Sequence, residues 1–127
     1  MARNLTLEKV NNTFGYSRFN CMGYALDTPD WMYVSIIDSD MKHFGYERCE
    51  FADIILGKYE GIAYRYGSCD WHFAYIAVDG SITHKPGCML VQTMTTEELL
   101  YPEGWCATPL GYYYDSPITF YRREVKQ

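Results

Sequence analysis

A β-hairpin signal in the middle of the chain restricts the possible folds more than any other feature. Residues 71–78 form a run of aromatic and β-branched side chains, which favours a strand, and Asp79-Gly80 after it favours a tight turn. Residues 81–85 predict the returning strand, and residues 62–66 predict a strand before the pair. This part of the chain therefore predicts an antiparallel sheet.

Short helices are predicted before and after these strands. Residues 20–26 favour a helix that Asn20 or Ser17 caps at its start. Residues 47–56 place apolar side chains on one helical face, and residues 96–100 predict a capped helical turn or short helix.

Two further strands, over 112–114 and 118–125, are predicted to close the sheet. Helices followed by a mostly antiparallel sheet predict an α+β fold with the N-terminal helices packed on the sheet. At 127 residues, of which 48% are hydrophobic, we expect a single domain over residues 1–127. Such a core needs neither metal nor disulfides to fold, so no cofactor is expected.

The charge balance and the hydropathy pattern exclude several classes of partner. A net charge of −5 argues against nucleic acid or an anionic membrane as the main partner. No apolar run approaches the roughly 20 residues that span a bilayer, and the N-terminus lacks a signal-peptide core. We therefore expect a cytoplasmic protein, in the host cytoplasm if a phage encodes it.

Five cysteines, an odd number without a Cys-x-x-Cys pair, do not suggest a disulfide framework. Cys21 falls in the first turn of the helix predicted over 20–26. The helix dipole there favours a thiolate, and the neighbouring N–H groups can hold an oxyanion. The alternative is a buried cysteine that packs beside Tyr24 and Ala25.

Two histidines frame the predicted hairpin. His72 opens the strand 71–78, and a strand fixes a side chain well enough for a general base. His84, in the returning strand, can bond to the second ring nitrogen of His72 and hold its tautomer. The alternatives are a strand-edge histidine bonded to water or backbone, and a polar residue beside the turn.

Three segments share their order with a known group: Asn20-Cys21-Met22-Gly23, then His72-Phe73-Ala74-Tyr75-Ile76, then His84. This order resembles the papain-like cysteine hydrolases, especially the NlpC-type branch, and residues 81–87 are similar to small bacterial and phage proteins. The resemblance implies a papain-like fold with Cys21 as nucleophile, His72 as general base and acid, and His84 as the residue that orients His72.

The resemblance also implies an oxyanion hole at the backbone N–H of Cys21. Asn20 and Tyr16 are then the oxyanion or support residues, with Asn20 standing where the branch has Asp.

The catalytic interpretation sets a condition on the hairpin register. A two-residue loop at Asp79-Gly80 would put His72 and His84 on opposite faces of the sheet, because side chains alternate along a strand. An odd-numbered loop or a bulge is needed. We therefore predict pairing centred on Val78, with His72 directly across from His84.

A zinc site is the alternative use of the same residues. Cys69-x2-His72 and His84-x3-Cys88 have the ligand types and spacing of a four-ligand zinc site on two segments.

Two functions follow from these patterns. The first is a cysteine peptidase or amidase that cleaves a peptide, isopeptide or cell-wall stem peptide through an acyl-thioester on Cys21. The alternative is a bacterial or phage inhibitor or binding protein on the same scaffold, with little or no catalysis. Its aromatic side chains, 17% of the chain, would then anchor a host protein.

Overall fold

The computed structural model describes residues 3–6, 10, 20–28, 32, 37–66, 71–85, 90–100 and 117–125. The described strands are β1 (Glu47–Cys49), β2 (Tyr59–Tyr66), β3 (Trp71–Ile76), β4 (Ile82–His84), β5 (Gln92–Met94) and β6 (Thr119–Glu124). The described helices are α2 (Cys21–Ala25), α3 (Ile37–His43), the 3-10 helix η1 (Phe51–Asp53) and α4 (Thr96–Leu100).

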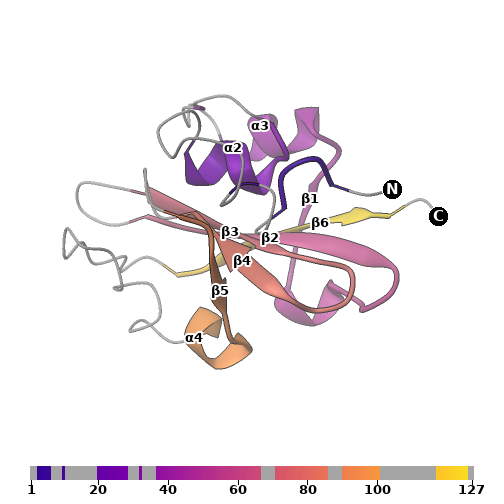
Figure 1. The fold of residues 1–127 in the computed structure, drawn as a ribbon. Helices are drawn as coiled ribbons and strands as arrows, with labels where there is room; N and C mark the ends of the chain where they lie inside the picture. The colour runs from indigo at the N-terminus through magenta and orange to yellow at the C-terminus, as the bar shows by residue number, and fades with distance from the viewer. Residues whose placement is uncertain are drawn as a thin grey trace.

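The six strands form one antiparallel sheet in the order β1-β6-β2-β3-β4-β5. Figure 1 shows α2 and α3 on one face of this sheet and α4 on the other. The predicted α+β class, with a helix near the N-terminus packed on an antiparallel sheet, is confirmed.

The two faces of the sheet carry separate apolar clusters. The α2-side cluster joins the helices to alternate residues of the central strands, among them Ile62, Phe73 and Tyr75. The α4-side cluster contains the intervening residues, such as Ala74 and Ile76, with Leu99 of α4. Both faces of β3 are therefore buried, and the alternation of side chains assigns each residue to one cluster.

The β3–β4 hairpin has a three-residue loop over 78–80. Tyr75 pairs with Thr83, the Ala77 N–H donates to the Ser81 carbonyl at 2.8 Å, and Gly80 has a φ of 92°. A type I turn followed by a glycine in the left-handed region gives this kind of loop. The odd-numbered loop is as predicted, but the pairing is centred on Asp79 and not on Val78.

Local signals located two helices correctly. Asn20 caps α2, because its side-chain oxygen accepts from the Gly23 N–H at 3.0 Å. Thr95 and Glu98 form reciprocal bonds of 3.0 Å at the start of α4, each accepting from the other's backbone N–H. The strand predicted over 118–125 is β6, and 112–114 lies outside the described residues.

The helix predicted over 47–56 is wrong. This segment forms the edge strand β1 and the single turn η1, because β1 pairs with β6 and the Arg122 Nε bonds to Glu47 at 2.9 Å. Phe51 and Ile54 reach the α4-side cluster, whereas Ile55 is 53% exposed. Sheet pairing outweighed the helical spacing.

Within the described residues, no helix combines the length and the apolar character that crossing a membrane requires.

Candidate functional site

His72 and His84 meet in a buried hydrogen bond between neighbouring strands. The His72 Nε2 lies 2.8 Å from the His84 Nδ1, and the two rings are nearly perpendicular. His72 is 3% exposed and His84 is 6% exposed. The predicted contact between the two imidazoles is confirmed, although the register differs. Tyr75 pairs with Thr83, so the same register places His84 across from Ala74. His72 is therefore the diagonal neighbour of His84 on the same face of the sheet.

Burial keeps both imidazoles neutral. Desolvation lowers the pKa of His72 well below its usual value of 6.5, and the proximity of His84 lowers it again. Desolvation also lowers the pKa of His84, to about 4, against a smaller opposing effect of Glu98. One neutral ring donates its N–H and the other accepts, so the bond couples the tautomer of one ring to that of the other.

Cys21 is the first residue of α2 and is 5% exposed. Asn20 supports this helix start. Besides capping Gly23, its oxygen accepts from the Met32 N–H at 3.2 Å, and its amide nitrogen donates to the Met32 carbonyl at 2.6 Å. The predicted position of Cys21 at a capped helix start is confirmed. Tyr16 lies outside the described residues.

The sheet separates Cys21 from the histidine pair. Cys21 belongs to the α2-side cluster with Phe73, and His72 alternates with Phe73 along β3. His72 and His84 therefore point to the α4 face, where His84 interacts electrostatically with Glu98. The expected cleft shared by the sulfur and both imidazoles is not formed by these described residues, because β3 directs His72 to the face opposite Cys21.

The zinc alternative finds no support in the geometry of the imidazoles. At 2.8 Å, the His72 Nε2 and His84 Nδ1 face each other across a hydrogen bond. Two nitrogens about 2.0–2.1 Å from one tetrahedral zinc would instead point at a common third position. Cys69 and Cys88 lie outside the described residues, within which no group of three metal-ligating side chains gathers.

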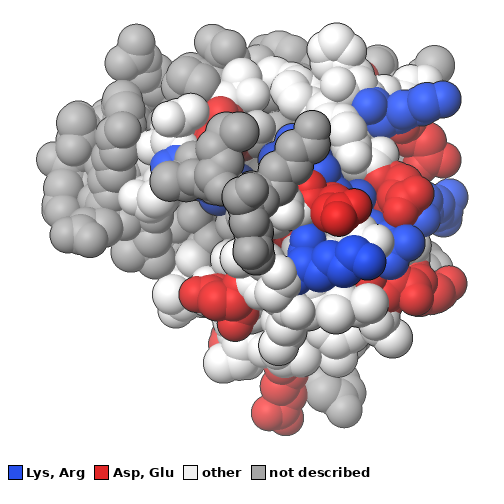
Figure 2. Space-filling view, turned by 90° about the vertical axis from the view of Figure 1, so that its right-hand side faces the viewer, with Lys and Arg blue, Asp and Glu red and all other residues white. Residues whose placement is uncertain are grey.

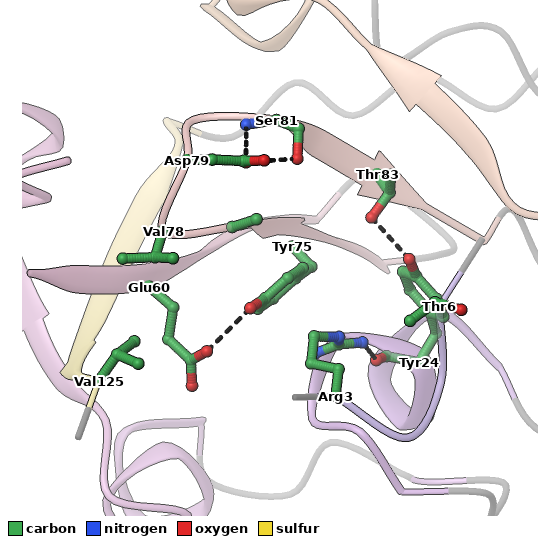
Figure 3. Close-up of a pocket in the computed structure, with 11 residues that line it drawn as sticks. Arg3, Thr6, Tyr24, Glu60, Tyr75, Val78, Asp79, Ser81, Thr83 and Val125 are labelled. Carbon is green, nitrogen blue, oxygen red and sulfur yellow. Dashed lines mark hydrogen bonds between the residues drawn. The ribbon is translucent and has the colours of Figure 1, made fainter. Parts of the chain in front are cut away.

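A cleft of about 370 Å³ lies on the α2 face of the sheet, near the hairpin loop. Figure 3 shows its walls: the N-terminal segment, Tyr24 of α2, the strands β2 to β4 and residues 77–81 at the hairpin loop. Its charged side chains are Arg3, Glu60 and Asp79, and Val78 and Val125 supply apolar surface. No motif in the sequence indicates this site, because its members are distant along the chain.

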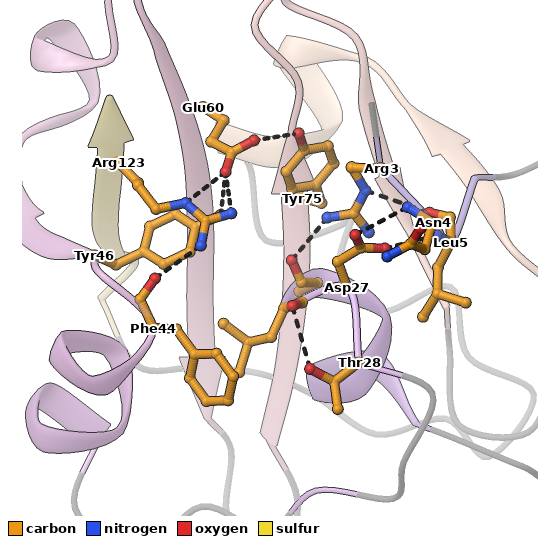
Figure 4. Close-up of polar contacts among 12 residues, drawn as sticks. Arg3, Asn4, Leu5, Asp27, Thr28, Phe44, Tyr46, Glu60, Tyr75 and Arg123 are labelled. Atoms are coloured by element: carbon orange, nitrogen blue, oxygen red, sulfur yellow. Dashed lines mark hydrogen bonds and ion pairs between the residues drawn. The ribbon is translucent and has the colours of Figure 1, made fainter. Parts of the chain in front are cut away.

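The Glu60 carboxylate, at one side of the cleft, already has hydrogen-bond and ion-pair partners. Glu60 accepts from the Tyr75 hydroxyl at 2.8 Å and from the Tyr46 hydroxyl at 3.2 Å, and Arg123 pairs with it through Nε at 2.7 Å (Figure 4). Burial and then the charge of Glu60 raise the pKa of both tyrosines, so their hydroxyls stay protonated donors. Arg123 balances the charge of Glu60.

Acidic and basic side chains are interspersed on the face of the molecule that Figure 2 shows. Among the described residues, ion pairs join Arg122 of β6 to Glu47 of β1 and Arg48 of β1 to Asp38 of α3. Exposed pairs of this kind contribute at most about 1 kcal/mol each to stability.

No family model, curated protein or solved structure matches this chain in the comparisons. The structure itself shows an α+β arrangement with a six-stranded antiparallel sheet. A papain-like fold stays a prediction.

Proposed function

We propose that this protein acts by non-covalent binding, with the cleft between Arg3 and Glu60 as its binding site. The supporting observation is the separation of Cys21 from the histidine pair by the sheet. A thiol nucleophile needs its general base within hydrogen-bond reach, and a rotamer change does not carry a side chain through a sheet. The cleft, in contrast, already has polar side chains held in place by hydrogen bonds.

A cysteine hydrolase is the second candidate, favoured by the 2.8 Å bond between His72 and His84 and by the capped helix start at Cys21. It requires His72 to face α2. A one-residue change in the register of β3 would turn His72 to the α2 face, but it would also turn Phe73 and Tyr75 out of the α2-side cluster.

Alkylation by iodoacetamide separates the two candidates. The rate at each cysteine is followed by mass spectrometry of the digested protein between pH 6 and 9, and Cys49 is the internal reference. Cys49 is half-buried, and burial raises its pKa to about 11. Under the binding proposal the buried Cys21 reacts no faster than Cys49, and its rate rises only at alkaline pH.

The hydrolase gives the opposite result. The binding proposal would be overturned if Cys21 were alkylated at least about tenfold faster than Cys49 at pH 7 and if His72→Asn slowed that alkylation. His43→Asn on the exposed side of α3 is the matched control and leaves either rate unchanged.

A further inference from the structure

Arg3 is a rigid cation whose hydrogen-bond partners are all neutral. It donates to the carbonyls of Leu5 at 3.3 Å, of Ala25 at 3.0 Å and of Tyr24, and its guanidinium stacks over the Tyr75 ring at 3.7 Å. Within the described part of the chain, no carboxylate forms an ion pair with it. The positive charge therefore remains available to a ligand.

The N-terminal segment is tied to α2 from both sides, which fixes Arg3 in place. Asp27, which follows the helix with a φ of 59°, accepts from the Asn4 N–H at 2.9 Å and from the Leu5 N–H at 2.6 Å (Figure 4). A side chain that is ordered before binding loses less entropy when a ligand arrives.

The cleft offers donors for an anion. A guanidinium has five N–H donors, of which the bonds to carbonyls use three, and the remaining hydrogen-bonding neighbours of Arg3 are the neutral hydroxyls of Tyr24 and Tyr75. Beside it, the Tyr24 hydroxyl and the Thr83 hydroxyl are 2.6 Å apart. One of them donates to the other, so one O–H remains to donate to a ligand.

Away from Arg3 the lining is mostly apolar, with Asp79 and Ser81 of the hairpin at one side, where the Asp79 carboxylate accepts from the Ser81 N–H and hydroxyl. Ala77, Val78 and Val125 line the cleft together with the tyrosine rings. Glu60 is saturated by its tyrosines and by Arg123, so it needs no ligand cation. A volume of about 370 Å³ is of the order of a dozen water volumes, which admits a phenyl-sized group with a carboxylate.

We infer that the cleft binds a monocarboxylate with an apolar or aromatic body, its carboxylate on Arg3 and the Tyr24–Thr83 hydroxyl pair. This inference rests on the proposed binding function and names its ligand class. The chemistry is shared by a free aromatic acid and by the C-terminal carboxylate of a peptide that ends in an apolar residue. Arg–carboxylate bonds are charge-assisted and are therefore stronger than bonds between neutral groups.

The test uses three probes on the full chain, followed by ¹⁵N chemical-shift titration: N-acetylphenylalanine, its uncharged amide, and 3-phenylpropionate. We expect both acids to shift the residues of the cleft, and N-acetylphenylalaninamide to bind at least about tenfold more weakly than its acid. If N-acetylphenylalanine binds at least about tenfold more tightly than 3-phenylpropionate, the ligand is a peptide C-terminus, and otherwise it is a free acid.

Variants locate the site. Arg3→Gln should lower the affinity for the acid to that of the amide, whereas Arg48→Gln, an exposed arginine of β1, should change nothing. Because Arg3 also ties down the N-terminal segment, Thr83→Val is a second variant that removes one hydroxyl and should weaken the acid selectively.

Two outcomes would overturn the inference: equal binding of acid and amide, or no shift in the cleft with any probe at about 10 mM, which corresponds to a very weak complex. If either outcome is found and iodoacetamide alkylates Cys21 slowly, only this ligand class is refuted. Fast alkylation of Cys21 refutes the binding proposal itself.

Discussion

Acidification should destabilise the protein through the buried histidine pair. Unfolding exposes His84, whose pKa then returns from about 4 to its usual 6.5. The pKa is lower in the folded state, so its contribution to stability is present above pH 6.5 and is lost as the pH falls towards 4. His84 alone should cost about 2 kcal/mol of unfolding free energy between pH 7.5 and pH 5.

The variant His84→Asn isolates this contribution. Asparagine places an amide, which can donate or accept, near the position of Nδ1, which lies 2.8 Å from the His72 Nε2, but it does not titrate. His72 adds to the acid loss in the same direction, because its pKa is also lowered, and Arg65 and Glu98 are the charged neighbours from β2 and α4. The contribution of the carboxylates to the acid loss is common to both proteins, so it cancels in the difference between wild type and variant.

Urea unfolding of both proteins at pH 7.5, 6 and 5 is the assay. The acid loss should be about 2 kcal/mol smaller in His84→Asn and unchanged in the exposed control His43→Asn. Equal acid losses in wild type and His84→Asn would refute the reasoning, since His84 would then titrate alike in the folded and unfolded chains.

Substitutions at three more positions test the packing and the polar contacts around the site by thermal and urea unfolding. Gly61→Ala should destabilise by about 1–3 kcal/mol, because its Cβ would lie 2.7 Å from the Ile54 Cδ1 and the neighbours must shift, and an unchanged melting temperature would contradict this close packing. Glu60→Gln should cost about 2 kcal/mol by leaving the half-buried Arg123 without its carboxylate, whereas a stability equal to wild type at all salt concentrations would show the pair to be dispensable. Asn20→Ala should cost about 1 kcal/mol through loss of the helix cap, and Asn20→Asp, which keeps the acceptor, should cost less.

The elements predicted correctly are those that local chemistry specifies. The hairpin at Asp79-Gly80, the cap at Asn20 and the strand around β6 each depend on a few adjacent residues. The segment 47–56 was assigned wrongly because its structure depends on pairing with β6, which lies far along the chain. The cleft was missed for the same reason, since Arg3 and Glu60 approach only through the tertiary fold.

The face on which His72 lies was not predictable from β3 itself. Almost every side chain of this strand is buried, so its sequence lacks the alternation of apolar and polar residues that marks an inner face. The contact between His72 and His84 depends only on an odd-numbered hairpin loop and was predicted. Their distance from Cys21 depends on which face of the sheet α2 covers.

Nuclear Overhauser effects from the histidine rings test this separation most directly. With the rings on the α4 face, the ring protons of His72 and His84 should show cross-peaks to the side chains of the α4-side cluster and of α4. Cross-peaks between the His72 ring and the β-protons of Cys21 would place the thiol and the imidazole on one face, and would contradict the account.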